Sequence, residues 1–136
     1  MLIPHGTLIL IADSSGYRLL RNRGSDRSPS LESVESSERE ETERPELHEP
    51  SALPDAAHRV DGSKRAHDRV VAGAAYDVLA RHGDAPAIVF APPRMLGAIR
   101  GQYSDAFRSR LLSDFDKDFI HHTPHEIAQF LQHFRV

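Results

Sequence analysis

The sequence contains no cysteine among its 136 residues. This absence excludes disulfide bonds, thiolate metal sites and a cysteine nucleophile, and it fits a reducing compartment. Long apolar runs are also missing, because the stretch at residues 1–11 is short, has no basic flank and soon reaches Asp13. A membrane span needs about 20 apolar residues. We therefore expect no signal peptide and no membrane contact, and we predict a cytoplasmic protein.

Several familiar enzyme motifs are absent as well. The chain has no Gly-x-Ser-x-Gly nucleophile motif, no Walker loop and no Gly-x-Gly-x-x-Gly fingerprint. These are the usual signatures of serine hydrolases, of P-loop nucleotide-binding proteins and of dinucleotide-binding domains. We therefore expect no cofactor and favour a non-enzymatic function.

Length and charge indicate one domain with an unusual segment. Domains cluster near roughly 100–150 residues, so we predict a single domain over residues 1–136, with an acidic, mobile insert at residues 24–60. Residues 30–55 hold nine acidic and two basic residues, a net charge of −7, whereas the whole chain carries −3 and the remainder therefore +4. The acidic run is most simply a solvated loop. Recruitment of a basic protein partner is an alternative.

Short apolar runs predict the strands of a sheet. Residues 7–12 and 17–20 indicate two strands joined by a turn, and Leu31 suggests one short edge strand. Such an edge could pair with a second copy of the chain, which would give a homodimer. Residues 87–91 and 111–115 predict two further strands, the first of them buried on both faces.

Helical patterns occur before the strand at residues 87–91, after it, and after the strand at residues 111–115. A helix is expected from Lys64 to His82, after a turn at residues 61–63. Pro93 can open a second helix. Thr123-Pro-His-Glu126 is a capping box with proline at the first helical position. Strands that alternate with helices predict an α/β fold with three layers, in which a mixed sheet carries helices on both faces.

Three groups of residues resemble one family of bacterial proteins. The first is Leu8-Ile-Leu-Ile-Ala-Asp13 with Tyr17-Arg-Leu-Leu20, the second is Phe90-Ala-Pro-Pro-Arg94 with Leu96-Gly-Ala-Ile-Arg100, and the third is Asp116-Lys-Asp-Phe119 with His122-Thr-Pro-His-Glu126. They occur in the family's order and cover about the first twenty and the last fifty residues. The chain thus resembles the host-attachment family, the proteins required for attachment to host cells.

The resemblance implies a fold and a set of partners. The family is similar to the middle domain of archaeo-eukaryotic peptide-chain release factors, whose Gly-Gly-Gln loop enters the ribosomal peptidyl-transferase centre. This implies a mixed-sheet α/β fold and contact with tRNA or ribosomes. The matching place, residues 59–65, contains Gly62 but no glutamine, and Gly101-Gln102 lies elsewhere. We therefore expect no peptidyl-tRNA hydrolysis, and only an indirect role in attachment.

Basic residues supply the first candidate site. The cluster at the start of the predicted long helix consists of Arg59, Lys64, Arg65 and Arg69. Helix N-termini attract anions, and lysine and arginine suit a phosphate backbone. Arg94 follows a predicted central strand, at the sheet edge where α/β proteins bind ligands. The structural alternative for the basic cluster is a solvated helix face. The alternative for Arg94 is an ion pair with Asp13.

Carboxylates supply the competing site. Asp116 and Asp118 would face the same side if the last strand reaches them, and Asp13 ends the first strand. Three such groups could hold Mg²⁺ in a metal-dependent hydrolase or nuclease, although strand-end aspartates commonly cap turns. The histidines near the C-terminus lack the arrangement of a zinc site. We favour RNA or ribosome binding, linked to translation, and expect no metal.

Overall fold

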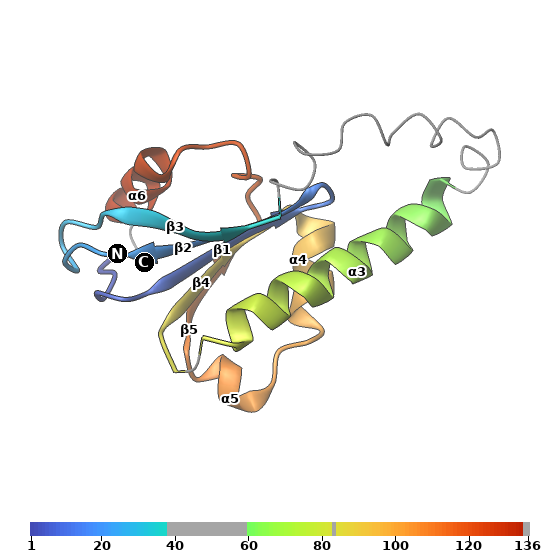
Figure 1. Ribbon diagram of the computed structural model, residues 1–136, viewed down its shortest axis with the longest axis horizontal. Coiled ribbons are helices and arrows are strands. Elements are labelled where there is room, and N and C mark those ends of the chain that lie inside the picture. The colour runs from blue at the N-terminus through green and yellow to red at the C-terminus, as the bar shows by residue number, and fades with distance from the viewer. Residues whose placement is uncertain (38–59, 83, 135–136) are drawn as a thin grey trace.

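A computed structural model describes residues 1–37, 60–82 and 84–134 of the chain, with the side chains of residues 60–66 outside the description. These ranges form a sheet with helices against both of its faces (Figure 1). The elements are β1 (Leu8–Asp13), β2 (Gly16–Asn22), β3 (Leu31–Ser36), α3 (Val60–Ala80), β4 (Ala87–Phe90), α4 (Pro93–Arg100), α5 (Asp105–Arg108), β5 (Leu111–Phe115) and α6 (Pro124–His133).

The sheet has five strands in the order β3-β2-β1-β4-β5. β1 pairs antiparallel with β2, and β2 pairs antiparallel with β3. On the other side, β1 pairs parallel with β4, and β4 pairs parallel with β5. The sheet is therefore mixed, and the predicted N-terminal hairpin and short edge strand are confirmed.

Both faces of the sheet are covered. α3 packs against β1, β2 and α4 on one face, and α6 contributes to the core on the other face. Leu8 and Leu10 of β1 lie in the core under α3 and α4, whereas Ile9 and Ile11 lie in the core with α6. A continuous apolar strand is what burial on both faces requires. The predicted three-layer α/β architecture is confirmed.

One local prediction differs from the structure, and one condition set for the carboxylate site is not met. α3 begins at Val60 rather than Lys64, so Gly62 lies inside the helix and the predicted turn at residues 61–63 is wrong. Glycine costs only about 1 kcal/mol in a helix, which a following run of good helix formers can offset. β5 ends at Phe115, before Asp116 and Asp118, so the alternation of strand side chains does not apply to those two residues.

The start of α6 confirms a prediction made from local chemistry. The Thr123 hydroxyl accepts a hydrogen bond from the Glu126 amide at 3.1 Å, and the Glu126 carboxylate accepts one from the Thr123 amide at 2.9 Å. Pro124 occupies the first helical position.

Within the described ranges, no helix combines the length and the apolar character that a membrane crossing requires.

Asn22 ties the N-terminal segment to the loop that follows β2. The side chain is fully buried, and its amide nitrogen donates to the Ile3 carbonyl at 2.9 Å. Its side-chain oxygen accepts from the amides of Gly24 and Ser30, each at 2.9 Å. Sequence patterns gave no sign of this residue, because its partners are backbone groups that only the fold brings together.

We expect Asn22→Ala to lower the free energy of unfolding by about 1–3 kcal/mol, because it leaves buried backbone groups without partners. Urea denaturation followed by circular dichroism would measure this change. Ser33→Ala, at an exposed position of β3, should stay within about 0.5 kcal/mol of the wild type. Equal stability of the two variants would contradict the role given to Asn22.

A bidentate ion pair joins the end of α4 to β5. Arg100 donates to the two carboxylate oxygens of Asp114 at 2.9 and 2.7 Å, and the Tyr103 hydroxyl donates to the same carboxylate at 3.2 Å. The hydrogen bonds and charge of Arg100 hold the pKa of Asp114 below its ordinary 3.8. Burial, together with the Asp114 charge, raises the pKa of Tyr103, so the tyrosine stays protonated as a donor.

This pair predicts a pH dependence of stability. A carboxyl group whose pKa is lower in the folded protein stabilises the fold at pH values above its unfolded pKa, near 3.8. This contribution is lost as the pH falls through the pKa of the folded state. We expect Arg100→Gln to destabilise the protein at neutral pH, with a difference from wild type that shrinks below about pH 4. Thermal melts across the acid range would measure it. Arg27→Gln, at an exposed position, should run parallel to the wild type at every pH.

Candidate functional site

The candidate site lies where β1 and β4 end. The two strands run parallel, and their last paired residues are Ile11 and Phe90. Beyond this point the two segments separate, because β1 continues into the hairpin with β2 while β4 leads into α4. In open α/β sheets, a crevice outside the carboxyl ends of such strands is the preferred place for a ligand.

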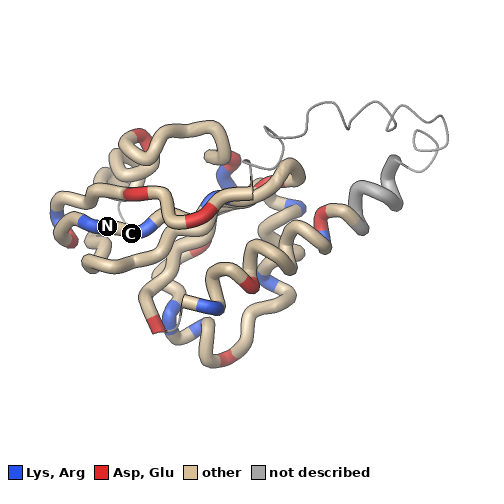
Figure 2. Tube along the Cα trace, in the orientation of Figure 1, with Lys and Arg blue, Asp and Glu red and all other residues tan. Residues whose placement is uncertain are grey.

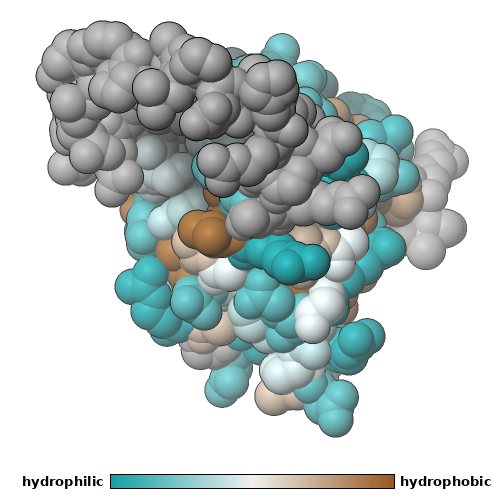
Figure 3. Space-filling view, turned by 90° about the vertical axis from the view of Figure 1, so that its right-hand side faces the viewer, coloured by the Kyte–Doolittle hydropathy of each residue, from teal (hydrophilic) through white to brown (hydrophobic). Residues whose placement is uncertain are grey.

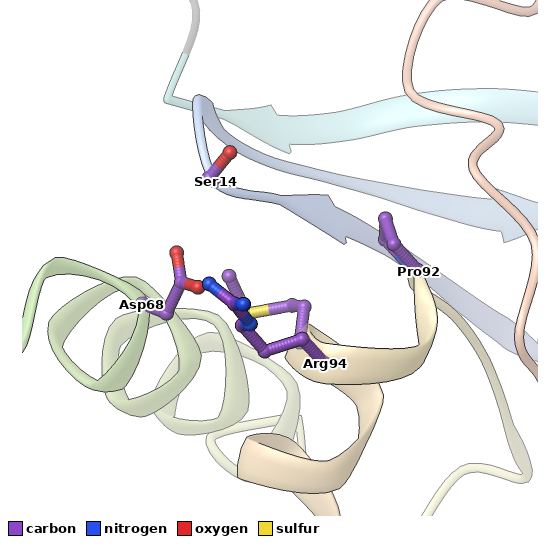
Figure 4. Close-up of a pocket in the computed structure, with 5 residues that line it drawn as sticks. Ser14, Asp68, Pro92 and Arg94 are labelled. Atoms are coloured by element: carbon purple, nitrogen blue, oxygen red, sulfur yellow. The ribbon is translucent and has the colours of Figure 1, made fainter. Parts of the chain in front are cut away.

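A small pocket occupies this place. It has a volume of about 130 Å³ and is lined by Ser14, Asp68, Pro92, Arg94 and Met95. The lining comes from the β1–β2 turn, from α3 and from the start of α4 (Figure 4). Pockets for drug-sized ligands measure roughly 300–1,000 Å³, so this one suits a single chemical group or one small unit of a larger ligand.

Asp68 is the unusual residue of the pocket. Only 4% of its surface is exposed, and its Oδ1 atom is buried without a hydrogen-bond partner in the described part of the chain. It shares the buried stripe of α3 with Ala72, Ala75 and Leu79, which lie four, seven and eleven positions further along. A buried carboxylate oxygen without a partner costs stability, and in a native structure it calls for an explanation. Unfilled acceptor capacity beside a pocket makes Asp68 a candidate ligand contact.

Arg94 faces Asp68 from the first turn of α4. Its side chain is exposed, and it makes no ion pair with any residue that the structure describes. The alternative pairing with Asp13 is therefore not formed. Figure 4 shows the Arg94 side chain and the Asp68 carboxylate directed toward each other across the pocket. The two groups give the pocket one basic and one acidic wall.

The start of α4 adds donors to the basic wall. The helix begins at Pro93 without a side-chain cap. Among the described hydrogen bonds, none uses the backbone amides of Arg94 or Met95. Free amides at a helix N-terminus, with the positive end of the helix dipole, favour an anionic group. Arg94 and the N-terminus of α4 therefore both favour an anionic group.

The family model described as "Protein required for attachment to host cells" matches residues 8–131. That range covers the whole sheet, most of α6 and every residue that lines the pocket. The chain belongs to this family. The predicted host-attachment membership is thus confirmed. Neither the curated proteins nor the solved structures gave a match.

In this family member, α3 carries three of the four residues of the predicted basic cluster, Lys64, Arg65 and Arg69. Arg69 is exposed. Lys64 and Arg65 lie in the first half of α3, which extends beyond the sheet (Figure 1). Arg59 lies outside the described residues. The structure therefore places the helix that bears the cluster, and Asp68 of the pocket belongs to that helix.

Asp13 has a local structural partner. Its Oδ1 atom accepts hydrogen bonds from the Ser15 amide at 2.8 Å and from the Ser15 hydroxyl at 2.6 Å, as an aspartate does when it closes a turn. Gly16 follows with a φ of 152°, and a side chain there would collide with the Ser37 hydroxyl. Asp13 therefore shapes the hairpin beside the pocket.

The carboxylates of the competing site do not come together. Asp116 and Asp118 are exposed in the loop after β5. Among the residues that the structure describes, no three or more histidine, aspartate or glutamate side chains are placed to hold a metal ion. The metal-dependent hydrolase hypothesis therefore gains no support from the geometry.

His67 fixes the hairpin relative to α3. Its Nε2 atom lies 2.6 Å from the Ser14 carbonyl oxygen. This contact precedes Asp68 by one residue, so it holds the β1–β2 turn over the buried carboxylate. Sequence patterns marked neither His67 nor Asp68 as a functional residue. An aspartate four positions before Ala72, inside the apolar stripe of a helix, was the signal that could have revealed the second of them.

We expect Asp68→Asn to leave the free energy of unfolding unchanged or to raise it, because the substitution removes a buried charge at constant shape. Urea denaturation would measure the effect. Asp77→Asn, at an exposed position of α3, is the matched control and should stay within about 0.5 kcal/mol of wild type. A loss of 2 kcal/mol or more, specific to Asp68→Asn, would mean that the carboxylate holds the fold together.

Proposed function

We propose that the protein is a non-enzymatic module that binds RNA and acts in translation, on tRNA or ribosomes. The observation that carries this proposal is the basic wall of the pocket. Arg94 is exposed and has no acidic partner among the described residues, and it stands at an uncapped helix N-terminus. A phosphate group satisfies both the guanidinium and the helix terminus.

The surroundings of the pocket support a polar, extended ligand. The exposed large apolar side chains of the described residues are Leu2, Val34, Val70 and Leu112, and each belongs to a different segment of the fold. Figure 3 shows that the visible side chains on this side of the molecule are mainly hydrophilic. A phosphate backbone fits such a surface better than an apolar peptide does.

The basic residues of α3 extend the footprint of the pocket. Arg65 and Arg69 are four positions apart, about one helical turn, on the helix that also carries Asp68. A strand of RNA that enters the pocket at Arg94 could therefore continue along α3. Outside residues 30–55 the chain carries a net charge of +4, which favours association with a polyanion.

Binding is proposed rather than hydrolysis. The resemblance to release factors would put the Gly-Gly-Gln loop at residues 59–65, where the chain has Gly62, a residue of α3, and no glutamine. The motif on which the release-factor mechanism depends is therefore missing from that stretch of the sequence. The relation to attachment would then be indirect: a cytoplasmic RNA-binding protein changes which other proteins a cell makes.

The first test reverses charge at the pocket. We expect Arg69→Glu with Arg94→Glu to weaken binding of a short single-stranded RNA by at least tenfold at low salt, because two phosphate contacts become repulsive. Fluorescence anisotropy would measure the dissociation constants. Raising the salt concentration should weaken wild-type binding along a steeper log–log slope than it weakens the variant.

The control carries the same change of charge elsewhere. Basic residues occur on several elements (Figure 2), and Arg27 and Arg108 are exposed and distant in sequence from the pocket residues. Arg27→Glu with Arg108→Glu should weaken binding far less. Sedimentation of a cell lysate on a sucrose gradient, with and without RNase, would locate the native protein. Equal loss in both double variants, or a protein that stays at the top of the gradient at low salt, would contradict the proposal.

A further inference from the structure

The pocket makes two opposite chemical demands within about 130 Å³. Arg94 and the amides at the start of α4 require an acceptor, preferably an anion. Asp68 requires a donor, because its carboxylate is buried and its Oδ1 atom has no partner among the residues that the structure describes. A simple anion would meet the first demand but would leave the second unmet, and it would lie close to the negative charge of Asp68.

A ligand that meets both demands carries a hydroxyl or amino donor next to an anionic group. In a strand of RNA, the ribose 2′-hydroxyl is adjacent to the 3′-phosphate. A donor hydrogen bond to an ionised carboxylate is roughly twice as strong as one between neutral groups. DNA lacks this hydroxyl, so the acidic wall of the pocket would find no donor at the corresponding position.

The size of the pocket agrees with one sugar-phosphate unit. Each water molecule occupies about 30 Å³ in the liquid, so the space corresponds to only a few waters. A ribose with one phosphate is of this order, whereas a whole nucleotide with its base is larger. The base would remain outside the pocket, and recognition would not depend on base identity.

We propose that the pocket binds one ribose 3′-phosphate unit of RNA, with the phosphate at Arg94 and the α4 N-terminus and the 2′-hydroxyl donating to the Asp68 carboxylate. This inference rests on the proposed RNA-binding function, and it adds that Asp68 distinguishes RNA from DNA. The arrangement also explains why a buried carboxylate faces an arginine without an ion pair within 4 Å in the described structure.

The test compares RNA and DNA oligonucleotides of the same sequence. We expect wild type to bind the RNA about tenfold or more tightly than the DNA, as a charge-assisted hydrogen bond predicts. Asp68→Ala should bring the RNA-to-DNA affinity ratio close to one, and Asp68→Asn, which keeps a neutral acceptor, should give an intermediate ratio. Arg94→Gln should weaken both complexes and leave the ratio unchanged. The ratio is the readout, because removal of the Asp68 charge alone affects both strands equally.

A second measurement separates this inference from the proposed function. Adenosine 3′-monophosphate, its 2′-deoxy analogue and inorganic phosphate are titrated into isotope-labelled protein, and the amide resonances of Arg94 and Met95 are followed. Tighter binding of the ribonucleotide, lost in Asp68→Ala, supports the inference even if neither oligonucleotide binds and the proposed function fails. Equal affinity for all three probes, or no shift at those amides, overturns it. An RNA preference that survives Asp68→Ala also overturns it and leaves the proposed function standing.

Discussion

The parallel pairing of β1 with β4 is the constraint on which the rest of the molecule depends. Residues of the two strands lie opposite one another from Leu8 and Ala87 to Ile11 and Phe90, and all of them are fully buried. Parallel strands cannot be joined by a tight turn, so the chain must cross over the sheet between them, and α3 is part of that crossing. The same pairing brings the β1–β2 turn and the start of α4 to one edge. The pocket is therefore a consequence of strand order.

Sequence patterns predicted the architecture well because its causes are local. The apolar run of β1, the prolines after β4 and the capping box of α6 each act within a few residues, and all three were recognised. The start of α3 was misplaced, because a glycine read as a turn is tolerated inside a helix when its neighbours favour one. The end of β5 was placed correctly at Phe115, and Asp116 and Asp118 therefore lie beyond the strand.

The candidate site was predicted only in part. Arg94 was found because it follows a buried strand, which is a rule about position. Asp68 and His67 were not predicted, because their roles depend on the residues that face them in the fold. A sequence does not show which residues face each other. Asn22 shows the same limit, since its hydrogen bonds run to backbone groups of residues 3, 24 and 30. Long-range partners of single polar groups are the information that folding adds.

The two ends of the described chain meet. The Met1 ammonium group donates to the Phe134 carbonyl at 2.6 Å. In Figure 1 the N label lies on the side of the sheet where β1 begins, whereas the pocket lies beyond the carboxyl ends of β1 and β4. A neighbouring domain, a fluorescent protein or a short linker that closes a circular permutant could therefore be joined at this corner. The edge that carries the pocket would remain accessible while the protein is tethered.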